Sequence, residues 1–115
     1  MNKNYTYSSS YVVEHEMVKS YKNNIEILLV KLDFLNQVVQ VFPVNFSRKI
    51  NNVKSIINIA IQNDCNRVII VANIDIDHQT FDKYLQSFMF LEIELKDYIF
   101  RDDNSYFSYY DNKKL

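Results

Sequence analysis

The stretch Arg67-Val-Ile-Ile-Val-Ala-Asn73, followed by Ile74-Asp-Ile-Asp-His-Gln-Thr-Phe-Asp82, decides the fold class of this chain. Its first part is a continuous run of apolar, mostly β-branched residues, which is typical of a strand buried on both faces of a sheet. The second part is a short polar loop leading into a helix, with Asp77 as the expected N-cap. A strand followed by such a loop and a helix predicts an α/β protein.

The same loop is where α/β proteins commonly place functional groups, because ligands bind beyond the carboxyl ends of the strands. It contains no pair of cysteines, no glycine-rich phosphate loop and no His-x-His. The ionisable side chains that it offers are Asp75, Asp77, His78 and Asp82. We therefore expect a functional surface here that lacks the usual catalytic groups.

Hydrophobic periodicity and turn residues predict the remaining elements of a mixed sheet flanked by helices. Helices are expected over residues 8–24 and 47–62 and after Asp77. Strands are expected over residues 25–34, 37–44, 67–73, 91–101 and 105–110. The apolar faces of the three helices are Val13, Met17 and Tyr21; Ile50, Val53, Ile57, Ala60 and Ile61; and Phe81, Leu85, Phe88 and Leu91. Pro43 cannot donate to a ladder, so its strand is expected at an edge.

The bulk composition predicts one globular domain over residues 1–115, with residues 1–7 and 111–115 as flexible tails. We expect cytoplasmic residence and no membrane partner, because no apolar run resembles a signal peptide or a membrane span. Cys65 is the only cysteine, which excludes an internal disulfide. Because the chain contains no glycine, positive φ angles are expected at Asn or Asp.

Three segments together carry a family resemblance. They are Leu32-Asp33-x-x-Asn36-x-Val38, the run from Ile59-Ala60-Ile61 into the strand at 67–73, and residues 91–109, which follow the pattern LxIxLxDHxIxxxxxYYSF. In their order and spacing they resemble the RadC-like branch of the JAB/MPN (JAMM) domain family. The resemblance implies a cytidine-deaminase-like three-layer fold.

The resemblance also implies which chemistry is missing. JAMM enzymes hold zinc with two histidines of an HxH motif and a downstream aspartate, leaving one position open for water. A glutamate on an earlier strand is their general base. Here Ala72 and Ile74 stand at the two histidine positions, Pro43 stands near the glutamate position, and Asp82 matches the aspartate. The expected site is therefore degenerate, without metal, cofactor or catalytic residue.

Two alternatives stay open. A metal-dependent hydrolase could use a rebuilt Asp/His site in the loop, because carboxylates bind hard cations such as Mg²⁺. A nucleic-acid-binding protein could contact phosphate through Arg48, Lys49 and Lys54 and stack bases on Tyr106, Phe107, Tyr109 and Tyr110. The net charge of -1 and the acidic residues Glu92, Glu94, Asp97, Asp102 and Asp103 disfavour that second alternative.

The preferred expectation is a catalytically inactive JAB-like domain that binds another macromolecule. The resemblance implies that this partner is a protein and that the role is assembly or regulation. The small size and the richness in Asn, Lys, Ile and Tyr suggest an accessory factor of a bacterial phage or mobile element that engages a host protein. An edge strand or the aromatic hairpin could also pair two copies. The expected interaction residues are Asp75, Asp77, His78, Asp82, Tyr106, Tyr109 and Tyr110.

Overall fold

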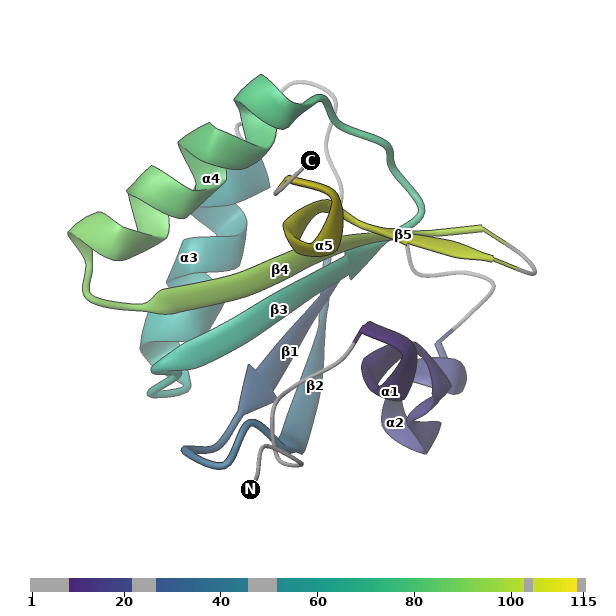
Figure 1. Cartoon of the computed structure of the whole chain (residues 1–115). Coiled ribbons are helices and arrows are strands. Elements are labelled where there is room, and N and C mark those ends of the chain that lie inside the picture. The colour runs from purple at the N-terminus through teal and green to yellow at the C-terminus, as the bar shows by residue number, and fades with distance from the viewer. Residues whose placement is uncertain (1–8, 22–26, 46–51, 103–104, 114–115) are drawn as a thin grey trace.

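The computed structural model describes residues 9–21, 27–45, 52–102 and 105–113. The chain forms an α/β domain with a mixed five-stranded sheet flanked by helices, which confirms the predicted class (Figure 1). The elements are α1 (Ser9–Glu14), α2 (Glu16–Lys19), β1 (Ile27–Leu32), β2 (Val38–Val44), α3 (Asn52–Gln62), β3 (Arg67–Ala72), α4 (His78–Phe90), β4 (Glu94–Arg101), β5 (Tyr106–Ser108) and α5 (Tyr109–Lys113). The predicted tail 1–7, the cap Ser47 and the apolar Ile50 lie outside the described residues.

The strand order in the sheet is β2-β1-β3-β4-β5. Strand β1 is antiparallel to both β2 and β3, whereas β3 and β4 are parallel and β5 is antiparallel to β4. Because β3 and β4 are parallel, their connection must cross over the sheet, and α4 makes that crossover. The predicted strand hairpin is confirmed from Ile27 to Val44, residues 25–26 lying outside the described part, and Pro43 is in the edge strand β2 as expected.

Alternating residues of the central strands fill two separate cores. On one face Leu29 and Ile70 pack with α3, α4 and α5. On the other face Val30 and Ile69 pack against α1 and α2. Figure 1 shows α3 and α4 over one side of the sheet and α1 and α2 over the other. Burial on both faces explains why β1 and β3 are almost uniformly apolar in sequence.

The predicted helix of residues 8–24 is wrong as a single element, because it breaks at His15. That residue is extended (φ -66°, ψ 138°), and its Nδ1 accepts a hydrogen bond from the N–H of Met17 at 3.2 Å, which makes it the N-cap of α2. The break rotates the buried face to Val12 and Val18. Met17, predicted as apolar core, is 41% exposed.

The predicted last strand over residues 105–110 is also wrong in extent. Strand β5 ends at Ser108, and Tyr109, Tyr110 and the next three residues form helix α5. The expected polar tail 111–115 is therefore helical as far as Lys113, while residues 114–115 lie outside the described part. The physical reason is a set of hydrogen bonds around Asp97 that caps α5 and is described below.

The helices over the first core are close to the prediction. Helix α3 buries Ile56 and Ala60, with Val53 and Ile57 partly buried, but Ile61 is 52% exposed because it lies beside that face. Helix α4 buries Phe81 and Phe88, but Leu91 follows its last residue as the C-cap and does not continue the buried stripe.

Positive φ angles occur at three described residues, Asn36 (64°), Asp64 (55°) and Glu92 (61°). The first two agree with the expectation that Asn and Asp replace glycine. Glu92 does not, and it turns the chain after α4 so that β4 begins at Glu94 and not at Leu91. No helix among the described residues is long and apolar enough to cross a membrane.

Candidate functional site

The loop from the carboxyl end of β3 to the start of α4 is the predicted functional site. Its residues alternate in environment, since Ile74 and Ile76 pack against the first core while Asp75 and Asp77 are exposed. The two isoleucines thus anchor the loop along its length. The same alternation leaves the two carboxylates on the exposed side of the loop.

Two tyrosines hold this loop from the neighbouring strand and helix. The hydroxyl of Tyr98 on β4 donates to the carbonyl oxygen of Ile74 at 2.5 Å. The hydroxyl of Tyr109 on α5 lies in hydrogen-bond contact with a carboxylate oxygen of Asp75 and with the carbonyl oxygen of Ile76. It also accepts the N–H of Ile76 at 3.3 Å. The loop is therefore closed by buried aromatic side chains.

Tyr109 is the centre of an aromatic cluster. Its ring centroid lies 4.9 Å from Phe107, 5.3 Å from His78, 5.6 Å from Tyr98 and 5.7 Å from Phe81. Most of these pairs are edge-to-face, the arrangement that the ring quadrupoles favour. Burial, and next the hydrogen bond with Asp75, raise the pKa of Tyr109 to about 12. Burial also raises the pKa of Tyr98, so both phenols are neutral in the folded protein.

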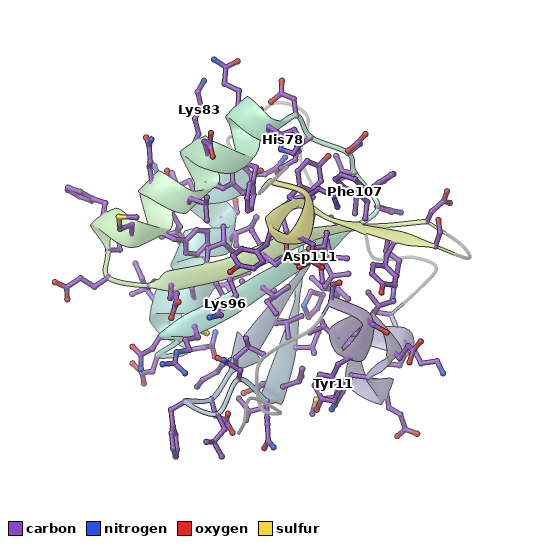
Figure 2. The ribbon with its side chains drawn as sticks, in the orientation of Figure 1. Tyr11, His78, Lys83, Lys96, Phe107 and Asp111 are labelled. Carbon is purple, nitrogen blue, oxygen red and sulfur yellow. The ribbon has the colours of Figure 1, made fainter. Side chains whose placement is uncertain are left out.

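The four ionisable residues of the loop lie in different surroundings. Asp75 meets Tyr109, and Asp77 accepts the N–H of Thr80 at 2.7 Å as the predicted N-cap of α4. The hydrogen bonds from Thr80 lower the pKa of Asp77. His78 is exposed beside Tyr109, and Figure 2 shows it on the same side of the molecule as Phe107. Within the described ranges, no three His, Cys, Asp or Glu side chains are placed to hold a metal ion.

The four positions that the resemblance named as degenerate ligand positions have different environments. Ala72 is 2% exposed, and Ile74 is partly buried. Pro43 is exposed and pairs with Leu28, whereas Ala72 pairs with Ile27 in the neighbouring row. Asp82 is partly buried on α4.

The proposed nucleic-acid contacts are only partly described. Lys54 is exposed on α3, but Arg48 and Lys49 lie outside the described residues. Tyr106 and Tyr110 are 40% and 45% exposed, whereas Tyr109 is 3% exposed and cannot stack on a base. Tyr109 and Tyr110 belong to helix α5, so the side-chain alternation of strand β5 does not extend to them.

Sequence reasoning missed the role of Asp97, which it placed among the exposed acids. Asp97 is fully buried, and its carboxylate accepts the hydroxyl of Ser108 and, at 2.8 Å, the N–H of Tyr110. The Ser108 hydroxyl in turn accepts the N–H of Asp111 at 3.1 Å. These bonds satisfy the first amides of α5, as N-caps do. The signal in the sequence was a carboxylate between the apolar residues Leu95 and Ile99.

Sequence reasoning also missed an apolar surface at the carboxyl end of α4. Phe90 is 87% exposed, Met89 is 71% exposed and Leu91 is 39% exposed. A groove of about 880 Å³ begins at this end and runs between α3 and α4. It is lined by Val53, Ile57, Thr80, Lys83, Tyr84, Gln86, Ser87, Phe90 and Leu91. The sequence signal was that Met89 and Phe90 fall outside the buried stripe of Phe81 and Phe88.

Cys65, the single cysteine of the chain, is buried after α3. Burial raises the pKa of its thiol, so it remains protonated and unreactive.

In comparisons with known proteins, no family model matches this chain and no curated protein matches it significantly.

Proposed function

We propose that this chain is a catalytically inactive RadC-like JAB domain that acts by binding another protein. The observation that carries the protein-binding part is the exposed apolar end of α4. Phe90, 87% exposed, borders a groove between α3 and α4, and its neighbour in sequence, Met89, is 71% exposed. Large apolar side chains exposed together beside a concavity are typical of protein-binding surfaces.

The order of elements supports the family part of the proposal. A helical segment, a strand hairpin, a helix, a strand, a helix and a second strand hairpin follow one another, as the resemblance requires. In the closing pattern LxIxLxDHxIxxxxxYYSF, Asp97 falls on the aspartate and Ser108 on the serine. These two residues, eleven apart in sequence, are joined by a buried hydrogen bond. This buried hydrogen bond gives a structural reason for the aspartate and the serine of the closing pattern to occur together.

The chemistry at the carboxyl end of β3 supports inactivity. The side chains of Ala72, Ile74 and Pro43 offer no lone pair where the resemblance places metal ligands and a base. Asp75 and Asp77 already bond to Tyr109 and Thr80, and both bonds serve to fix the loop. A rebuilt metal site would have to break these contacts first.

Affinity purification of the tagged full chain from the cell that encodes it tests the proposal. After nuclease treatment, we expect a specific protein to co-purify and to remain bound in high salt, since an apolar contact is weakly screened. Elemental analysis of the same sample should find no stoichiometric zinc. Recovery of nucleic acid alone, or of one zinc per chain, would contradict the proposal.

A further inference from the structure

The groove between α3 and α4 is built by two helices that run in the same direction. Helix α3 is followed by strand β3. Helix α4 connects the end of β3 to the start of the parallel strand β4. Both helices therefore run opposite to these strands, side by side on one face (Figure 1). The amino ends of α3 and α4 lie at one end of the groove, and their carboxyl ends at the other.

Apolar side chains from both helices line the groove. Val53 and Ile57, one turn apart on α3, face it, and Phe90 and Leu91 border it at the carboxyl end of α4. From Thr80 to Leu91 the wall is roughly 16 Å long at 1.5 Å per helical residue. That length matches about three turns of a partner helix.

The charge along the groove is uneven. Among the described residues that line it, Lys83 on α4 is the one charged side chain, and burial raises the pKa of Tyr84. Lys54, exposed next to Val53, is a second cation on the facing helix α3. Phe90 and Leu91 lie at the opposite end. No carboxylate is among the described residues that line the groove, although Asp77, whose pKa the hydrogen bonds from Thr80 lower, lies near enough for the charge of Lys83 to lower that pKa further.

We infer that this groove binds an amphipathic helix of a partner protein, with apolar residues at i, i+4 and i+7 against Val53, Ile57 and Phe90 and a carboxylate at the end beside Lys83. The inference rests on the proposed function and names the partner's chemistry. Helix-in-groove recognition uses such apolar anchors, and complementary charge fixes the register. A second copy of this groove fits less well, because its lining supplies no carboxylate to Lys83.

A photo-crosslinking residue at Gln86, which is exposed in the groove, tests where the partner binds. The same residue placed at Gln40, exposed on β2, is the matched control. In lysate of the native cell, the Gln86 variant should crosslink to one protein segment, identified by mass spectrometry, that has the apolar spacing and the acidic residue. Crosslinks to a second copy of this chain, or to nucleic acid, would overturn the inference.

A synthetic peptide of the crosslinked segment then tests the contacts by fluorescence anisotropy with the full chain. Phe90→Ser should weaken binding at least about 30-fold, as loss of an aromatic anchor does. Phe34→Ser is its control, because Phe34 is 80% exposed at the hairpin tip of β1 and β2 and does not line the groove. It should leave binding within about twofold.

Charge reversal tests the position of the carboxylate. Lys83→Glu should weaken the peptide about 10-fold, and a peptide with Lys in place of its acidic residue should regain most of that loss. Lys19→Glu, on α2, is the control and should have no such effect. If a specific protein binds but Phe90→Ser and Lys83→Glu change nothing, the groove is the wrong surface and the proposed function stands. If no specific protein binds at all, both fail.

Discussion

At the scale of single residues, Asp97 is a carboxylate without exposed surface in the middle of β4. Burying a charged or polar group is costly unless its hydrogen bonds are made. Here the carboxylate accepts the Ser108 hydroxyl and the Tyr110 N–H, so the cost is offset by capping α5. Asp97 therefore decides that the chain turns into a helix after Ser108.

Replacement of this carboxylate tests that role. We expect Asp97→Ala to lower the free energy of unfolding by about 2 to 4 kcal/mol, because it leaves buried donors of Ser108 and Tyr110 unsatisfied. Urea unfolding followed by circular dichroism measures the change. Asp64→Asn, at an exposed turn with φ 55°, is the control and should stay within about 0.5 kcal/mol. An equal effect of both substitutions would show that Asp97 has no special role.

Tyr109 predicts how stability depends on alkaline pH. Its pKa is raised to about 12 by burial and by Asp75, whereas tyrosines of an unfolded chain titrate near about 10. The folded state therefore holds this proton more strongly. The resulting stabilisation is complete below pH about 10 and is lost as the pH rises through about 12. Tyr98, whose pKa burial raises as well, acts in the same direction.

We expect Tyr109→Phe to reduce the fall in unfolding free energy above pH about 10, since phenylalanine has no proton to lose. At neutral pH the same substitution should destabilise by about 1 to 3 kcal/mol, because the Ile76 N–H loses its acceptor. Denaturant melts across this pH range measure both effects. Tyr106→Phe, at a 40% exposed position, is the control and should keep the wild-type pH profile. Parallel profiles for wild type and Tyr109→Phe would refute the assignment.

At the scale of elements, α1 and α2 are too short to be stable alone and depend on what holds them to the sheet. Val12 and Val18 supply the apolar contact. Arg101, at the end of β4, donates to the carbonyl oxygens of Val18 and Tyr21, both at 3.3 Å. A cation at the carboxyl end of a helix satisfies carbonyls that have no partner within the helix. Arg101 thus fixes α2 to the sheet.

Arg101→Met should therefore loosen the amino-terminal helices without unfolding the sheet. We expect hydrogen exchange at the Val18 and Ser20 amides to become about 10-fold faster, with the amides of β3 unchanged. Lys19→Met, on α2 but without this contact, is the control and should leave exchange unaltered. A matching loss of protection in β3 would mean that Arg101 supports the whole fold.

The elements also show which structure can be predicted from sequence. The hairpin of β1 and β2, the edge position of Pro43 and the cap Asp77 were predictable, because apolar runs, proline and capping residues act locally. The breaks at His15 and Ser108 were not. His15 is an uncommon N-cap, and the bond that ends β5 joins Ser108 to Asp97 on another strand. Contacts between distant residues override local propensity there.

At the scale of the whole molecule, the loop after β3 is covered by side chains, whereas the surface along α3 and α4 is exposed. At the carboxyl end of β3, Tyr98 and Tyr109 cover the loop that the sequence marked as a functional site. The position of that loop was predictable, but its closure depends on α5, which the sequence did not reveal. The exposed apolar surface instead lies along α3 and α4, at Phe90. Binding through a helical face is therefore better supported than chemistry in the loop.

Metal titration of the intact protein distinguishes these two uses of the fold. A metal that binds only the folded state at about 100 times its Kd stabilises by about 2.7 kcal/mol, which would raise the Tm of a domain this size by roughly 10 °C. We expect no such rise with zinc or magnesium, because Asp75 and Asp77 bond to Tyr109 and Thr80 and because no three His, Cys, Asp or Glu side chains of the described residues are placed to hold a metal. Differential scanning fluorimetry measures the shift, with His78→Ala as the matched variant. A rise that this variant abolishes would place a metal in the loop and make hydrolase activity the better proposal.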